Sequence, residues 1–125
     1  MKGTYTYLPM LLAGLLAAIE SFAGNPDIVD VKAACPEKGY CNFSVTLSHA
    51  DEGWDHYADR WEVLDPDGEI LGTRTLLHPH VHEQPFTRSL SQIAIPDGLE
   101  RVFVRAHDSV HGYGGKKIEV QLPSR

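Results

Sequence analysis

The sequence has no long apolar run after its first two dozen residues, few basic side chains and no internal repeat. A membrane-spanning helix needs roughly 20 apolar residues, and the run from Leu8 to Ile19 is much shorter than that. Lysine and arginine together number 11 against 17 acidic residues, for a net charge of −6 with neutral histidines. Such a chain is repelled by phosphates, so nucleic acid and anionic membranes are poor candidates as partners. Repeat architectures and flexible linkers are excluded as well.

The first 23 residues have the layout of a secretory signal peptide. Lys2 precedes the apolar run, and the small residues Ser21 and Ala23 flank Phe22, which is the pattern that signal peptidases cleave. We expect cleavage after Ala23, and a short membrane anchor is the alternative. No cysteine lies near this position, which argues against a lipid-anchored form. The expected domains are therefore a signal peptide at 1–23 and one folded domain at 24–125, in a periplasmic or secreted protein without a membrane span.

The chain contains only two cysteines, Cys35 and Cys41. In an exported protein the simple expectation is that they pair. They bracket the turn-forming run PEKGY, so the disulfide would close a short hairpin. A redox or thiolate metal site is the alternative, and it would require both thiols to stay reduced.

Alternating polar and apolar residues, interrupted by turn signals at short intervals, predict an all-β fold. The turn signals are PEKGY, DPDG and IPDG, in which proline and glycine occupy the places that tight turns favour. About seven strands in about 100 residues are typical of an immunoglobulin-like antiparallel sandwich. The expected strands are 28–34, 42–48, 60–64, 69–77, 86–95, 101–107 and 116–122.

If successive strands run antiparallel, the three tight turns fall at one end of the sandwich and the three longer connections at the other. The longer connections, or the strand ends beside them, carry all seven histidines. Clustered loops on a rigid scaffold are where binding residues are commonly found. The histidines are His49, His56, His78, His80, His82, His107 and His111.

Neutral imidazole is a common ligand for copper, zinc and other transition metals. On a strand, residues two apart point to the same face about 6.5 Å apart, so His80 and His82 would be able to share an ion. A further ligand would come from His107, Asp108 or His111, while His78, His49 and His56 are additional candidates. The alternative for HPHVH is an exposed strand face. Carboxylates around residues 51–59 also raise the alternative of calcium, against which the number of histidines argues.

Two stretches resemble known families. HVHE, at 80–83, is similar to the copper-ligand stretch of copper-zinc superoxide dismutases, although their bridging histidine and zinc loop are not recognisable, so that activity is not carried over. The segment VFVRAHDSVHGYGGKKIEV resembles the last two strands of bacterial immunoglobulin-like and fibronectin-like domains. This second resemblance implies the same sandwich fold.

The final loop also resembles that of superoxide reductases, which are iron proteins with an immunoglobulin-like fold. In that family a ligand cysteine is followed three residues later by a ligand histidine and a glycine. His111 and Gly112 match this pattern, whereas Asp108 stands in the place of the cysteine. His49 and His56 lie where the family has histidines ahead of a tryptophan-bearing strand. The resemblance implies a metal site at this end of the fold, without the thiolate on which the iron chemistry depends.

Three interpretations of function follow. The first is an exported carrier, buffer or sensor of a divalent transition metal, copper or zinc. The second is a non-catalytic interaction module that holds a periplasmic partner protein through Trp54, Tyr57 and Tyr113. The third is a small metalloenzyme acting on reactive oxygen species, which would need an open coordination position. No catalytic residue is assigned.

Overall fold

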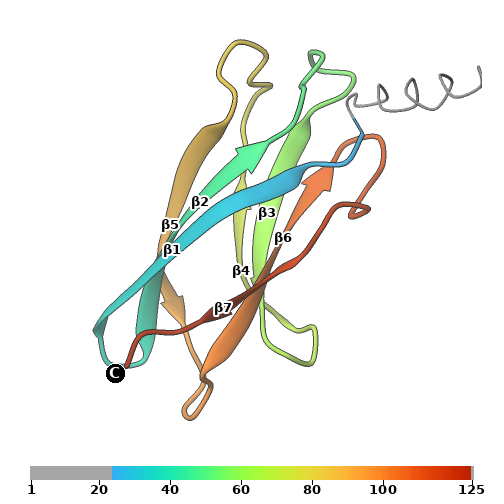
Figure 1. Ribbon diagram of the computed structural model, residues 1–125. Helices are drawn as coiled ribbons and strands as arrows, with labels where there is room; N and C mark the ends of the chain where they lie inside the picture. The colour runs from blue at the N-terminus through green and yellow to red at the C-terminus, as the bar shows by residue number, and fades with distance from the viewer. Residues whose placement is uncertain (1–23, 125) are drawn as a thin grey trace, which may run out of the picture.

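A computed structural model describes residues 24–124, which form two antiparallel sheets. Figure 1 shows the seven strands, which pack as a sandwich. The expected signal peptide and its cleavage position lie outside the described residues. The strands are β1 (Asp27–Glu37), β2 (Tyr40–Ser48), β3 (Ala58–Leu64), β4 (Ile70–Thr75), β5 (Phe86–Ala94), β6 (Arg101–Asp108) and β7 (Ile118–Gln121).

One sheet has the order β1-β2-β5 and the other β4-β3-β6-β7. Strand β4 pairs with β3, which places it in the four-stranded sheet, and every pairing is antiparallel. The expected all-β, immunoglobulin-like sandwich of about seven strands is therefore confirmed. Within the described residues there is no helix long and apolar enough to cross a membrane.

The core follows from period-two alternation in the central strands. In β2, Phe43, Val45 and Leu47 are buried while the residues between them are more exposed, and β6 alternates in the same way. Because successive side chains point to opposite faces of a strand, each sheet presents one apolar face to the other. Trp61 of β3 lies in the middle of this core with no exposed surface. Trp61, Val63, Val102 and Val104 are all fully buried.

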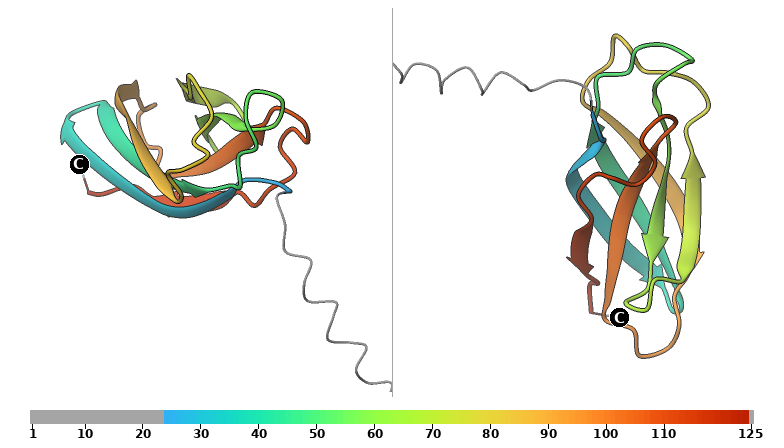
Figure 2. Two further views of the ribbon diagram at one scale, coloured as in Figure 1. Left: turned by 90° about the horizontal axis from the view of Figure 1, so that it is seen from above. Right: turned by 90° about the vertical axis from the view of Figure 1, so that its right-hand side faces the viewer.

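The short connections between strands lie at one end of the sandwich and the long connections at the other (Figure 2). The short turns at 38–39, 65–69 and 95–100 share one end, and the long loops at 49–57, 76–85 and 109–117 share the other. Side-chain hydrogen bonds fix one of the short turns, because Asp65 Oδ1 accepts from the backbone N–H groups of Asp67 and Glu69. All seven histidines lie on the long loops or at their junctions with the strands.

A disulfide joins Cys35 to Cys41 across the β1–β2 hairpin, with the Cα atoms 4.0 Å apart. The predicted pairing is confirmed. Cys41 is fully buried in the core, so the bond ties the edge strand β1 to the packed interior at the end opposite the histidines.

Replacing both cysteines with alanine is expected to lower the free energy of unfolding by roughly 2 kcal/mol, because the bond closes only a short loop in the unfolded chain. Urea denaturation of the double variant measures this loss. Because the disulfide is far from the long loops, the arrangement of these loops in the folded variant should match that of the wild type. A loss below about 0.5 kcal/mol would contradict the loop-closure account.

Candidate metal centre

The long loops bring His49, His56 and Asp108 together. His49 directly follows β2, His56 lies near the end of the loop that leads into β3, and Asp108 is the last residue of β6. One ligand atom from each of the three residues lies within 4.8 Å of the other two. Asp108 Oδ2 is 2.6 Å from His49 Nε2 and 2.8 Å from His56 Nε2. A single carboxylate oxygen therefore faces two imidazole nitrogens.

The start of the β6–β7 loop orients the Asp108 carboxylate. Its Oδ1 accepts hydrogen bonds from the backbone N–H groups of Val110, at 2.6 Å, and His111, at 3.0 Å. The loop turns back at Gly112, which has a φ of 72°, a conformation that glycine adopts without strain. With Oδ1 occupied by the backbone, Oδ2 is left to face the histidines. The side chain is completely buried.

Each histidine has a second carboxylate on the far side of its ring. Asp51 Oδ1 is 2.5 Å from His49 Nδ1, and Glu52 Oε1 is 2.7 Å from His56 Nδ1. Carboxylates that accept a hydrogen bond from Nδ1–H fix the tautomer of a histidine and leave Nε2 as a lone-pair donor, which is the usual arrangement behind metal-binding histidines. Both rings are thus set to present Nε2 toward Asp108.

The number of protons available to these contacts shows why the arrangement suits a cation. A neutral imidazole carries one N–H, but His49 and His56 each lie between two carboxylates. One contact of each neutral ring would therefore set a nitrogen lone pair against an oxygen lone pair. Either a second proton on each ring or a cation between the Nε2 atoms and Asp108 Oδ2 removes this repulsion. The cluster is consequently a group that could hold additional protons or a metal ion.

Asp51 also holds the loops in place around the site. Its Oδ1 accepts a hydrogen bond from the backbone N–H of Ala58 at 3.0 Å, and its Oδ2 accepts one from the backbone N–H of His80 at 2.6 Å. The carboxylate is buried, so these bonds are shielded from water and compensate for its desolvation. The 49–57 loop, the start of β3 and the 76–85 loop thereby share one anchor.

His111 is the fourth candidate ligand. Its Nδ1 lies 3.5 Å from Asp108 Oδ2, and its ring lies 5.0 Å from that of His56. The side chain is 43% exposed, so the cluster is buried on the side of His49 and open to solvent on the side of His111.

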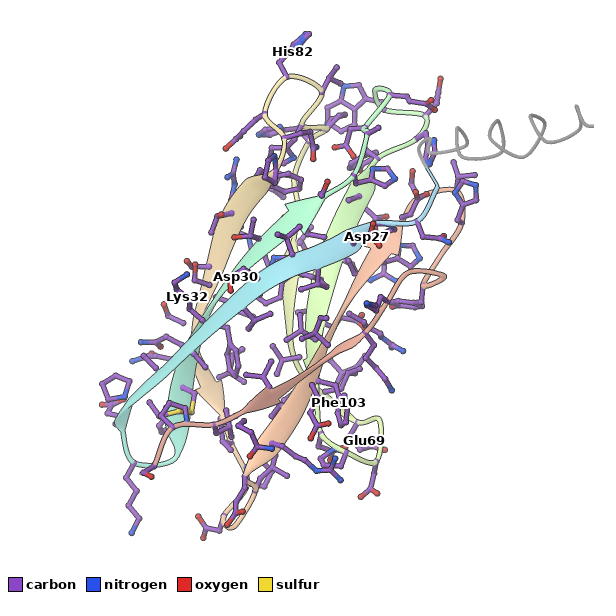
Figure 3. The ribbon with its side chains drawn as sticks, in the orientation of Figure 1. Asp27, Asp30, Lys32, Glu69, His82 and Phe103 are labelled. Atoms are coloured by element: carbon purple, nitrogen blue, oxygen red, sulfur yellow. A yellow bond between two sulfur atoms is a disulfide. The ribbon has the colours of Figure 1, made fainter. Side chains whose placement is uncertain are left out.

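The other histidines of the sequence prediction lie outside this group. His80 is buried and its ring stacks on Phe86 at 4.0 Å. Within the described residues, neither ring nitrogen of His80 has a hydrogen-bond partner. His78 is exposed and packs beside His80. His82 lies at the exposed tip of the loop (Figure 3), so His80 and His82 do not share a face. The loop is a turn at this point and not a continued strand.

His107 belongs to a separate network on the outer face of the four-stranded sheet. Its Nδ1 is 2.6 Å from Asp59 Oδ1, and its ring contacts Tyr113 edge to face. Tyr113 donates a hydrogen bond to the buried Glu62, which also pairs with Arg105. Burial alone would raise the pKa of Glu62, but the hydrogen bonds from Arg105 and Tyr113 hold it below its usual range. This network fixes the β6–β7 loop from the outside.

The expected partner contacts Trp54, Tyr57 and Tyr113 lie on two of the long loops. Trp54 is 67% exposed and packs edge to face on Tyr57. Tyr113 is partly exposed and lies under Arg105, with its hydroxyl already bonded to Glu62. Of these side chains, Trp54 offers the largest free apolar surface.

Comparison with known proteins found a relative by sequence. The chain is 46% identical over 98 residues to a protein of Halomicrobium mukohataei named "Putative lipoprotein", and the match covers 78% of this chain. The chain spans about half the length of that relative, 48%. No family model and no solved structure matches, so the resemblance to superoxide reductases receives no support from these comparisons.

The pKa shifts in the cluster predict how the stability of the metal-free protein depends on pH. The hydrogen bond to Glu52, together with Asp108, raises the pKa of His56 despite its burial. Burial alone would raise the pKa of Asp108, but the N–H groups of His111 and Val110 and the two imidazoles hold it below its usual range. The stabilisation from His56 is present below its unfolded pKa, near 6.5, and is lost as pH rises through the higher folded value. The stabilisation from Asp108 is present above about pH 4 and is lost as pH falls through the lower folded value.

We therefore expect His56 and Asp108 to contribute most to the stability of the metal-free protein between about pH 4 and pH 6.5, and the contribution of His56 to fall above that window. Burial lowers the pKa of His80, so the contribution of this ring has the opposite sign and falls as pH drops below about 6.5. Thermal melting from pH 3 to pH 9 in the presence of a chelator measures this profile. The control is His56→Gln, in which the decline above pH 6.5 should be smaller. An unchanged decline in that variant would contradict the assignment to His56.

Proposed function

We propose that the protein binds a divalent transition metal at its long-loop end. The observation that carries this proposal is the convergence of His49 Nε2 and His56 Nε2 on Asp108 Oδ2, with Asp51 and Glu52 behind the two rings. An ion between these atoms replaces the protons that would otherwise be needed there. Its binding depends on deprotonated imidazole, so it weakens as pH falls.

The ligand types favour copper or zinc. Imidazole nitrogen with one carboxylate oxygen suits these ions, whereas calcium takes about 6–8 oxygen ligands. His111 offers a further nitrogen on the open side of the cluster, where its exposed side chain lies on the path by which an ion enters. An accessible site of this kind suits reversible carriage, buffering or sensing of the metal.

The remaining histidines have secondary roles in this proposal. His78, His80 and His82 lie on the neighbouring loop, where the His80 ring stacks on Phe86 and His82 lies at the exposed tip, and they supply no ligand in this proposal. His107 binds Asp59 and supports the β6–β7 loop, which carries His111. Neither group is required for the primary site.

We further propose that the protein is exported. The first 23 residues have the layout of a signal peptide, the disulfide suits an oxidising compartment, and the matched relative is named a lipoprotein. Residues 24–125 would then work as the mature domain in the periplasm or outside the cell.

The test is titration of the metal-stripped protein with Zn(II) and Cu(II) by calorimetry at pH 7.5. One ion should bind tightly to the wild type. In His56→Ala and Asp108→Asn the affinity should fall by more than about 100-fold, since loss of an orienting partner alone costs about 10–100-fold. His82→Ala is the matched control and should bind like the wild type. Equal affinity in all four proteins, with folding verified by circular dichroism, would refute the site.

A second candidate function rests on exposed apolar side chains around the same loops. Trp54, Leu77, Val81 and Val110 are 67%, 75%, 46% and 57% exposed. Exposed apolar side chains that gather at one end of a domain are common on surfaces that contact a protein partner. This surface would serve an interaction module with or without a metal, and variants of His56 and Asp108 separate the two functions.

A further inference from the structure

The first described residues lie directly against the candidate metal centre. The carbonyl oxygen of Gly24 is 3.2 Å from His49 Nε2, the nitrogen that faces Asp108. Two ligand atoms bound about 2.1 Å from one ion lie roughly 3.0–3.4 Å apart. The Gly24 carbonyl oxygen is therefore at a spacing from His49 Nε2 that two ligands of one ion can have. The 2.6 Å and 2.8 Å contacts of Asp108 Oδ2 with the two Nε2 atoms are hydrogen-bond distances, which an ion would widen.

Packing against the β6–β7 loop holds this segment in place. Pro26 is fully buried, and a Cβ on Gly115 would lie 2.1 Å from the carbonyl oxygen of Pro26. A Cβ on Gly114 would lie 2.6 Å from the Asn25 side chain. Only glycine at position 115 lets the backbone of Pro26 approach so closely, whereas a side chain at position 114 would displace the side chain of Asn25. Figures 1 and 2 show the start of β1 running beside this loop.

Signal-peptide cleavage would change the chemistry of Gly24. Hydrolysis of the Ala23–Gly24 peptide bond consumes one water, leaves a carboxylate on Ala23 and creates an α-amine on Gly24. The nitrogen of an intact peptide bond shares its lone pair with the carbonyl and does not bind such ions readily. A free α-amine loses its proton near pH 8 and then carries an available lone pair. Together with the carbonyl oxygen of the same residue, it would form a five-membered chelate ring with an ion.

We propose that the α-amine and carbonyl oxygen of Gly24 complete the metal site once the signal peptide has been removed. This inference rests on the proposed metal binding and adds a ligand that side chains do not supply. The buried side of the cluster, beside His49, is the side to which Gly24 is held. Processing is thereby coupled to metal affinity, because the precursor binds the ion with side chains alone and the mature protein adds the chelate.

The experiment compares two exported forms of the full chain. One is the natural sequence, and the other carries two serines inserted between Ala23 and Gly24, so that cleavage leaves Gly24 inside a peptide bond. A chain with two serines added after Arg125 is the matched control. Mass spectrometry establishes each N-terminus. Calorimetry with Zn(II) and Cu(II) gives the affinities, and pulsed electron paramagnetic resonance of the Cu(II) forms labelled with [15N]glycine reports direct coordination by a glycine nitrogen.

The natural form should begin at Gly24. It should bind the metal ion at least about tenfold more tightly than the inserted form, a difference of about 1.4 kcal/mol. Its Cu(II) complex should show strong 15N coupling that the complex of the inserted form lacks. The control should behave like the natural form. A different natural N-terminus, equal affinities or absent 15N coupling would overturn the role of Gly24 while leaving the side-chain site intact. Absence of tight binding in all three forms would instead overturn the proposed function itself.

Discussion

The buried carboxylate of Asp108 is the constraint on which the loop end depends. A carboxylate without exposed surface is costly unless it is hydrogen-bonded and its charge is compensated. Its backbone bonds satisfy Oδ1, and the two imidazoles must satisfy Oδ2. Because Asp51 and Glu52 add two further negative charges behind the rings, neutral histidines would leave the cluster strongly negative. Two protons or one divalent cation reduce the charge of these three carboxylates and two rings from −3 to −1, and these two states compete.

The sandwich makes this cluster possible by fixing the ends of three strands. His49 follows β2, Asp108 ends β6, and β3 begins just after His56, so the positions of the ligands follow from the packing of the core. Asp51 then ties the intervening loop to β3 and to the β4–β5 loop. These hydrogen bonds limit movement of the loops around His49, His56 and Asp108. His111 lies on the open side of the cluster, and its side chain stays exposed, as exchange of an ion would require.

Much of this architecture could be predicted from the sequence. Alternation and turn signals indicated the strands, and counting antiparallel strands placed all histidines at one end, as the structure has them. The sequence did not show which histidines meet. HPHVH has the spacing of a shared strand face, but the chain turns there, so His80 faces the core and His82 faces solvent. The roles of Asp51 and Glu52 were also missed, although the acidic residues beside His49 and His56 in SHADEGWDH were a usable signal.

In the proposed metal centre, Nε2 of His49 and of His56 is the nitrogen that is free to bind an ion. Long-range 1H–15N NMR of the histidine side chains, in metal-free and Zn(II)-loaded protein at pH 7.5, tests this assignment most directly. The account predicts that Zn(II) shifts Nε2 of His49 and His56 while their Nδ1 atoms stay protonated toward Asp51 and Glu52, and that the His82 ring is unchanged. Zinc-induced shifts confined to His78, His80 and His82, or coordination through Nδ1 of His49 and His56, would contradict it.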